Sequence, residues 1–259
     1  MLDRRDGLIR ARGFTLVELV IVITIIGILS VVVSRFIILS VEGYVSSSEQ
    51  QASALAADAG NRQFSRALSR ALPGSVRVGS RCMEYIPVLA HTYYRTLPGS
   101  AVASLQVISL RNRLVAYAAV VPAANVNLYA NASDTAVTGR QATLNPQPNA
   151  ATLSFNGQHR FPADSPRNQL FMVDTPEMFC VVADKIWHYA GYGFNTSMVQ
   201  TPTGGRSAVM MSGLVPGSTV FRYVPAGLGS LERVQLRYQT ASGSQTMAFE
   251  TEAQLNYAP

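Results

Sequence analysis

A long apolar run near the start of the chain constrains the fold more than any other feature. From Phe14 to Ser34 the sequence carries a single charged residue, Glu18. About 20 apolar residues suffice to cross a bilayer as one α-helix. Four arginines precede the run and Arg35 follows it, and such charge favours a cytoplasmic N-terminus. We therefore expect a single-pass inner-membrane protein whose bulk lies on the periplasmic side.

Two ordinary explanations of this run are less satisfactory. A secretory signal peptide has a shorter apolar region followed by a small-residue cleavage site, and no Ala-x-Ala site follows here. A plain membrane anchor leaves Glu18 unexplained, because a carboxylate within a membrane helix costs about 2.5–3.5 kcal/mol. Glu18 is therefore expected to have a partner, unless it lies solvated at the level of the lipid headgroups.

The segment Gly13-Phe14-Thr15-Leu16-Val17-Glu18 resembles the signature of the type IV prepilin family. The resemblance implies that a membrane peptidase removes residues 1–13 as a leader, cutting between Gly13 and Phe14. It also implies that Phe14 becomes N-methylated and that Glu18 becomes the fifth residue of the mature chain. In the family, this carboxylate pairs with the N-terminal amine of a neighbouring subunit during assembly.

The same resemblance implies a set of partners and a destination. The partners are prepilin peptidase, other major and minor pilins, the inner-membrane assembly platform and the lipid of the inner membrane. The processed chain would leave the membrane within a pilus on the cell surface.

The helix is expected to continue beyond the membrane-spanning part, residues 14–34, as an amphipathic half over residues 35–72. This second part contains no proline, and Ala57, Phe64, Leu68 and Leu72 recur at helical spacing. Pro73 and Gly74 follow and should end the helix. Gly27, Gly43 and Gly60 mark places where it could bend.

Residues 73–259 have the texture of a β-rich head domain. Short runs rich in valine, tyrosine, phenylalanine and threonine alternate with turn residues. These runs are 75–78, 82–90, 103–110, 114–121, 152–155, 170–174, 179–183, 219–224, 233–240 and 246–251. Residues 125–150 read instead as an irregular excursion. The fold class is therefore predicted as α+β, a long N-terminal helix packed on a mainly antiparallel β head.

The two cysteines, Cys82 and Cys180, are predicted to form a disulfide, because the head would lie in an oxidising compartment. Two buried free thiols are the alternative. Too few cysteines are present for a four-thiolate metal site.

Other chemistry finds little support in the residues. The net charge is +6, but the arginines are scattered, whereas nucleic-acid binders concentrate positive charge in a patch. We therefore expect no nucleic-acid partner. His188, between Trp187 and Tyr189, is predicted to be packed or hydrogen-bonded rather than a ligand. A calcium site could draw on a few acids, although solvated surface carboxylates are the better interpretation: Asp164, Asp174, Glu177 and Asp184. With no catalytic constellation in view, we expect no cofactor and a structural protein rather than an enzyme.

The resemblance narrows when the residues up to about 90 are included. The segments 71–78 and 82–88, with Phe36 and residues 40–44, resemble the large minor pilins of the mannose-sensitive haemagglutinin pilus system. A J-type minor pseudopilin of type II secretion has a similar plan and remains an alternative. A further alternative is an adhesive head that binds a surface glycan or protein.

Overall fold

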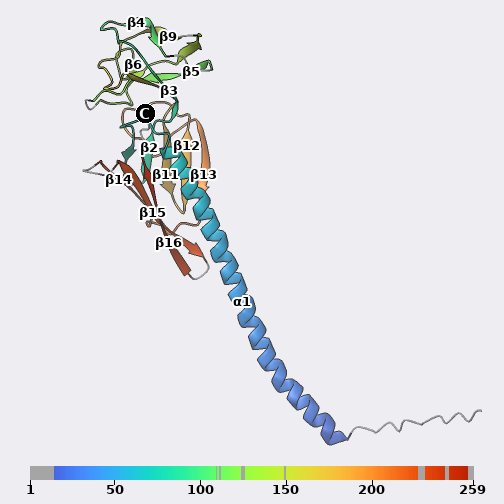
Figure 1. Ribbon diagram of the computed structural model, residues 1–259. Coiled ribbons are helices and arrows are strands. Elements are labelled where there is room, and N and C mark those ends of the chain that lie inside the picture. Colours follow the sequence, from blue (N-terminus) through green and yellow to red (C-terminus); the bar gives the residue numbers. More distant parts are fainter. Residues whose placement is uncertain are drawn as a thin grey trace, which may run out of the picture. The chain divides into compact units, whose positions relative to one another are not determined.

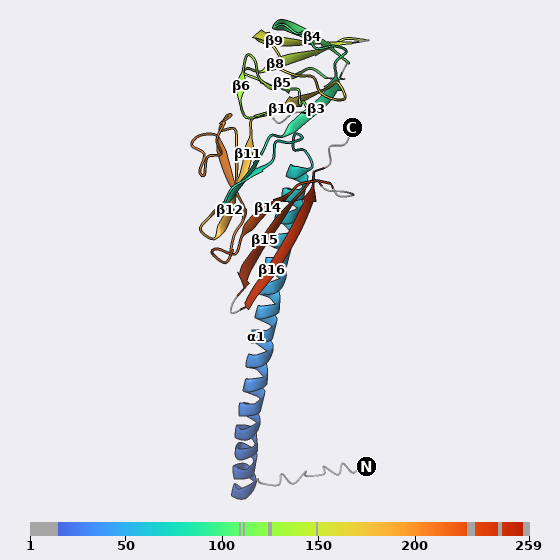
Figure 2. The ribbon, with the colours of Figure 1, turned by 90° about the vertical axis from the view of Figure 1, so that its left-hand side faces the viewer.

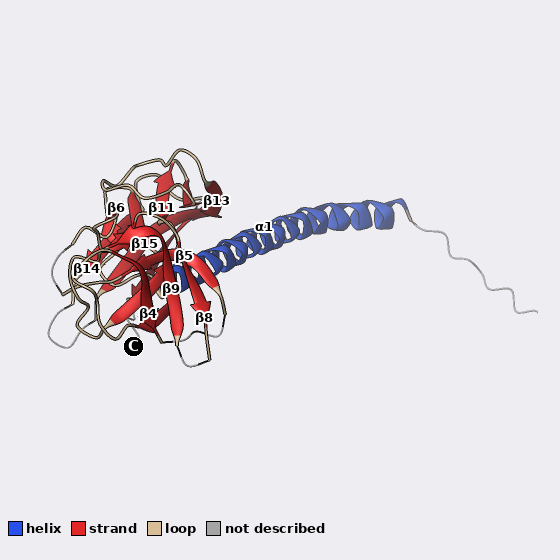
Figure 3. Ribbon diagram, turned by 90° about the horizontal axis from the view of Figure 1, so that it is seen from above, coloured by secondary structure: helices blue, strands red, loops and turns tan. Residues whose placement is uncertain are grey.

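The computed structural model describes residues 15–108, 110, 112–123, 126–148, 150–226, 231–242 and 245–255. These residues contain one α-helix, α1 (Leu16–Leu68), and sixteen β-strands (Figure 1). Every regular element described after α1 is a strand, drawn red in Figure 3. The predicted α+β class is confirmed: a long apolar N-terminal helix packs on a mainly antiparallel β head. Two compact units divide between Gln51 and Ala52, within α1.

The two units contain very different stretches of α1. In the first unit every residue from 15 to 49 is exposed. In the second, the buried helix residues are Ala57, Gly60, Phe64 and Leu68. Their spacing of three or four residues places them on one face of the helix. The apolar face predicted at Ala57, Phe64 and Leu68 is confirmed and packs on the β head, whereas residues 35–49 show no buried face and Leu72 lies beyond the end of the helix.

The predicted bend at Gly60 has a different structural meaning. α1 is helical through Gly60, and a Cβ atom there would overlap the side chain of Met211. The glycine lets the helix approach β13 (Arg206–Met211) closely.

The helix ends at Leu68, four residues before the predicted end at Leu72. Its last turn tightens, because the N–H groups of Arg70 and Ala71 bond to carbonyls three residues earlier. The chain then pairs with a strand segment instead of continuing the helix. Leu72 N–H donates to Ile86 O at 2.8 Å, and Val88 N–H donates to Arg70 O at 2.7 Å.

Two sheets accompany the helix in the second unit. A five-stranded sheet has the order β1-β2-β11-β12-β13, and a three-stranded sheet has the order β14-β15-β16. The strands of the first, besides β13, are β1 (Arg77–Val78), β2 (Cys82–Tyr85), β11 (Glu177–Val182) and β12 (Lys185–Ala190). Those of the second are β14 (Val220–Val224), β15 (Arg233–Ser242) and β16 (Gln245–Gln254).

An eight-stranded sheet completes the head and has the path β3-β10-β5-β8-β9-β4, with β6 and β7 at its side. Its strands are β3 (Val88–Tyr93), β4 (Val102–Val107), β5 (Leu114–Ala119), β6 (Asn131–Ala132), β7 (Val137–Thr138), β8 (Ala142–Pro146), β9 (Ala151–His159) and β10 (Gln169–Val173). Figure 2 shows this sheet beyond β11 and β12, at the end of the head away from β16.

The eight-stranded sheet is an insertion. It lies wholly between β2 and β11, which pair with each other in the five-stranded sheet. We call residues 88–173 the inserted module. The chain leaves the five-stranded sheet at Ile86-Pro87 and returns at Asp174, whose N–H donates to Pro87 O at 3.0 Å. The two crossings therefore lie side by side.

Apolar clusters stabilise each part of the head and join the two parts. One combines the buried helix face with both smaller sheets, and the ring of Phe64 lies 5.8 Å from that of Phe179 and 6.4 Å from that of Phe221. A second cluster, around Leu144 and Leu153, lies within the inserted module. A third, around Val137, also includes Leu72 and Ile86 and so joins the module to the rest of the head.

The predicted strands are found, with corrections. The run 82–90 is two strands, because the chain passes from one sheet to another at Ile86-Pro87. The prediction of an irregular excursion over residues 125–150 is wrong in part, since the described residues of this range contain β6, β7 and β8. Strands β12 and β13 were not predicted. Strand β15 alternates as a half-buried strand does, with Val234, Leu236 and Tyr238 buried.

Candidate functional site

The cleavage residues predicted from the sequence, Gly13 and Phe14, lie outside the described residues. The structure begins at Thr15, immediately before the first turn of α1. Glu18 N–H donates to Thr15 Oγ1 at 3.3 Å, so the threonine satisfies one of the free donors of a helix N-terminus. Glu18 lies in this first turn, where the helix dipole favours a negative charge.

The first unit of the chain presents apolar side chains on all sides. Residues 15–49 are exposed, and most of those up to Val45 are Ile, Leu or Val. Among the described residues, α1 is the one helix long and apolar enough to cross a membrane. A soluble protein rarely exposes so large an apolar surface without a partner.

Three hydroxyls on this stretch donate hydrogen bonds within the helix. Thr24 Oγ1 donates to a carbonyl oxygen one turn earlier, at 2.8 Å from Ile21 O. Ser30 and Ser40 donate in the same way, at 2.7 Å and 2.8 Å. A helix surrounded by lipid or by other helices needs such internal partners, because no water is available to its polar groups.

The sequence comparison agrees with this arrangement. Residues 9–34 match the prokaryotic N-terminal methylation motif. This motif supports a type IV prepilin-like protein. Proteins of that family are structural, and the motif implies anchoring in the inner membrane, processing by prepilin peptidase and assembly with other pilins. The match includes Gly13, Phe14 and Glu18 and covers about a tenth of the chain. The chain has no significant match among curated proteins or solved structures.

The other predicted pair, Cys82 and Cys180, lies in the head and forms a disulfide. The two cysteines face each other on the paired strands β2 and β11, with Cα atoms 4.2 Å apart. Both are buried. The carbonyl oxygen of Gln200 lies 3.2 Å from one sulfur and 3.3 Å from the other. The disulfide therefore joins the strands on either side of the inserted module.

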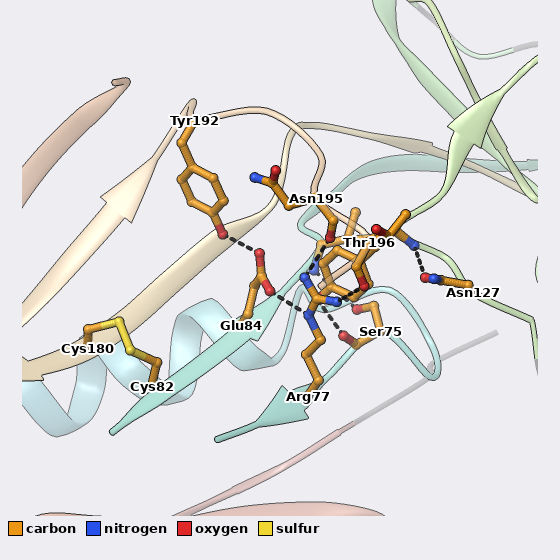
Figure 4. Close-up of polar contacts among 11 residues, drawn as sticks. Ser75, Arg77, Cys82, Glu84, Asn127, Cys180, Tyr192, Asn195 and Thr196 are labelled. Atoms are coloured by element: carbon orange, nitrogen blue, oxygen red, sulfur yellow. Dashed lines mark hydrogen bonds and ion pairs between the residues drawn. A yellow bond between two sulfur atoms is a disulfide. The ribbon is translucent and has the colours of Figure 1, made fainter. Parts of the chain in front are cut away.

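Beside the disulfide lies a polar cluster centred on Arg77 and Glu84 (Figure 4). Arg77 Nε lies 2.5 Å from Glu84 Oε2, and the other guanidinium nitrogens donate to the carbonyls of Asn195 and Thr196 at 2.8 Å. Tyr192 O–H donates to Glu84 Oε1 at 2.6 Å.

The same guanidinium also contacts an aromatic ring, since its central carbon lies 3.5 Å from the centroid of Tyr129. Tyr129 O–H donates to Ser75 O at 2.6 Å. Burial raises the pKa of the Tyr129 hydroxyl, and the charge of Glu84 adds to the effect. Burial, followed by the hydrogen bond to Glu84, likewise raises the pKa of Tyr192. Both phenols therefore remain hydrogen-bond donors. The hydrogen bonds of Arg77 hold the 192–196 loop against β1 and β2.

A second polar group contradicts one sequence-based interpretation. Glu177, predicted to be a solvated surface carboxylate, is partly buried on β11. It accepts hydrogen bonds from Tyr85 O–H at 2.5 Å and pairs with His188 Nε2 at 2.9 Å. His188 also stacks on Phe179, with ring centroids 4.7 Å apart, so the prediction of a packed, hydrogen-bonded histidine is confirmed.

The protonation of Glu177 follows from these contacts. Burial alone would raise the pKa of its carboxyl group. The hydrogen bonds from His188 and Tyr85, with the charges of His188 and Arg206, outweigh burial and hold the pKa below its ordinary value. No group of three or more His, Cys, Asp or Glu side chains suited to a metal ion occurs within the described part of the chain.

Sequence reasoning missed Arg77 and its partners. They come from β1, β2 and two distant loops, so no local pattern unites them. One signal was present: Glu84 is the single acid in the apolar run 82–90. A lone carboxylate in a buried strand is expected to have a cationic or hydrogen-bonding partner.

Proposed function

We propose that this protein is a minor type IV pilin of the mannose-sensitive haemagglutinin type, similar to the large subunit designated O. It acts as a structural subunit in pilus assembly, in a complex that initiates the tip, and supports attachment. The observation that carries the proposal is the methylation motif at residues 9–34, continuous with a helix whose apolar side chains are exposed over residues 15–49.

Each part of the chain has a role in this proposal. Residues 1–13 are the leader that prepilin peptidase removes, and residues 14–34 hold the subunit in the inner membrane and later among other pilins. Residues 35–72 carry the rest of α1 and its connection to the head. Residues 73–259 are the periplasmic head, and a buried disulfide suits that oxidising compartment.

Glu18 is proposed to set the axial position of the subunit. Apolar contact supplies little register between helices that are apolar on all sides, since lipid tails are about as apolar as the side chains. A carboxylate in such surroundings is stabilised by a cation. The methylated amine of Phe14 on a neighbouring subunit is a cation of the right kind, and pairing with it would fix one helix against the next.

Two measurements test the proposal. The intact mass of the mature protein should show loss of residues 1–13 and gain of one methyl group. Glu18→Gln should be processed normally but incorporated into pili several-fold less than the wild type. Glu42→Gln is the matched control, because Glu42 is also an exposed acid of α1 but lies outside the motif.

The outcomes separate the alternatives. An unprocessed chain in cells with active prepilin peptidase would overturn the assignment. Normal incorporation of Glu18→Gln would remove Glu18 from assembly. Recovery of the subunit in sheared pili, at a small fraction of the major pilin, supports the pilus. Its absence from pili, together with loss of protein secretion on deletion, would favour the minor pseudopilin.

A further inference from the structure

The inserted module contains a cavity that the assembly function does not use. Its volume is about 470 Å³, within the usual range for small-molecule sites. Three short segments line it, 131–133, 138–140 and 155–159. They come from β6, from the end of β7 and from the C-terminal half of β9.

One wall of this cavity is a break in the sheet. The register between β4 and β9 passes from Ser104↔Ser154 directly to Val102↔His159. Residues 155–158 therefore face a single residue of β4, and β8 pairs with β9 only as far as Ser154. Such bulges redirect side chains and recur beside binding sites. Here Gly157, at φ +111°, allows the turn of the bulge.

The opposite wall is fixed by hydrogen bonds. The buried His159 holds Thr135 O through Nε2 at 3.1 Å. Arg160 binds Asp134 through two nitrogens, at 2.9 Å and 2.6 Å. Gly139 N–H donates to Ala132 O at 3.0 Å, and a Cβ at Gly139 would come within 3.1 Å of the Ala132 backbone. The cavity is therefore held in shape before any ligand arrives.

The lining has a distinctive chemistry. It offers the amides of Asn131, Asn156 and Gln158, the hydroxyl of Ser133 and the guanidinium of Arg140, with no carboxylate. Asn156, Gln158 and Arg140 are exposed and so available to a ligand. Amides both donate and accept hydrogen bonds, as sugar hydroxyls do. A free guanidinium matches the fork of a carboxylate. The half-buried ring of Phe155 adds an apolar surface.

We propose that this cavity binds a carboxylated saccharide, such as a uronate residue of a surface polysaccharide. Arg140 binds the carboxylate, and Asn156 and Gln158 on the bulge bind the ring hydroxyls. The pyranose lies along Phe155. The inference goes beyond the proposed assembly role, since the purified protein must bind the sugar whether or not it enters a pilus.

The test uses the full mature chain in a detergent that carries no sugar headgroup. Ligand-observed NMR compares methyl glucuronoside and methyl galacturonoside with methyl glucoside, methyl galactoside and acetate, each up to about 10 mM, because a single sugar is expected to bind with a Kd on the order of 1 mM. Binding of the uronates, with much weaker binding of the neutral sugars and acetate, is the expected result.

Variants tie the binding to the cavity. Arg140→Gln should weaken uronate binding about tenfold, the usual effect of losing a charged hydrogen bond. Asn156→Ala should weaken it as well. Arg95→Gln is the control, because Arg95 is an exposed arginine of the same module outside the cavity. Each variant should be processed and incorporated like the wild type.

Several results would overturn the inference. If neither uronate binds, this cavity is not a uronate site. The same conclusion holds if Arg140→Gln and Asn156→Ala leave uronate binding unchanged. Equal binding of uronate and neutral sugar removes the role of the carboxylate. Equal binding of acetate reduces the site to a simple anion site. None of these outcomes affects the assembly proposal, whose tests are processing and incorporation.

Discussion

The cluster around Arg77 allows a sharp test of what holds the head together. Glu84 has an exposed fraction of 0%, and Arg77 is its cationic partner, 2.5 Å away. Replacing Arg77 by methionine keeps most of the side-chain volume but leaves a buried carboxylate bonded to Tyr192 alone. Breaking one side of a buried ion pair typically costs about 3–5 kcal/mol. Arg77→Met should lower the free energy of unfolding by about this amount.

Denaturant unfolding of the mature chain measures the effect. Trp187 is the only tryptophan, and it lies on β12 opposite Cys180 of β11. Its fluorescence therefore reports directly on the five-stranded sheet. Arg81→Met is the matched control, since Arg81 is exposed on the same stretch of chain. An exposed substitution of this kind usually changes stability by less than about 0.5 kcal/mol.

A double variant separates the buried charge from packing. Arg77→Met combined with Glu84→Gln leaves no charge unpaired, so it should be destabilised less than Arg77→Met alone. The reasoning is refuted if Arg77→Met and Arg81→Met unfold at the same denaturant concentration. It is also refuted if the losses in the two single variants simply add.

Three further outcomes are expected. Cys180→Ser should cost about 2–5 kcal/mol, and mass mapping of the unreduced wild type should show a Cys82–Cys180 peptide rather than two alkylatable thiols. The lowered pKa of Glu177 means that its stabilising effect is full above its ordinary pKa of 4.5 and is lost as pH falls through the lower folded value; Glu177→Gln should flatten acid unfolding curves in that range. Phe64→Ala should cost about 3–5 kcal/mol, whereas Leu55→Ala on the exposed side of the same helix, where Leu55 is 70% exposed, should leave the unfolding midpoint almost unchanged.

The N-terminal helix was predictable because its signals are local. An apolar run, a glycine before an aromatic residue and a lone acid lie within about twenty residues. The buried face at Ala57, Phe64 and Leu68 follows from helical periodicity alone. The residue at which the helix ends is not set by a local signal. Pro73 suggested a stop near Leu72, but Arg70 and Leu72 are drawn into backbone pairing with Ile86 and Val88.

For the head, the sequence predicted a series of strands but not how they pair. Its topology depends on β2 pairing with β11, about 95 residues away in sequence, and no local pattern encodes that choice. The missed strands β12 and β13 have mixed side chains, because one lies near the edge of its sheet and the other forms the edge. The disulfide was predictable by elimination, since only two cysteines exist. The cavity of the inserted module required the register break at β9, which only the structure provides.

The insertion between β2 and β11 has a consequence for the order of folding. In the proposed topology, Cys82 emerges from the membrane while its partner is still 98 residues behind it in the chain, and closing so long a loop costs considerable chain entropy. The inserted module has an apolar cluster of its own, around Leu144 and Leu153, and its two crossings lie side by side at Pro87 and Asp174. Once the module folds, its adjacent ends shorten the effective loop between the two cysteines and bring them together. We therefore expect oxidation of Cys82 and Cys180 to follow folding of the module.

Thiol trapping during export tests this order. Both cysteines should stay reduced for longer when the module is destabilised, for example by Leu153→Ala. Equal oxidation rates in the variant and the wild type would disprove the order.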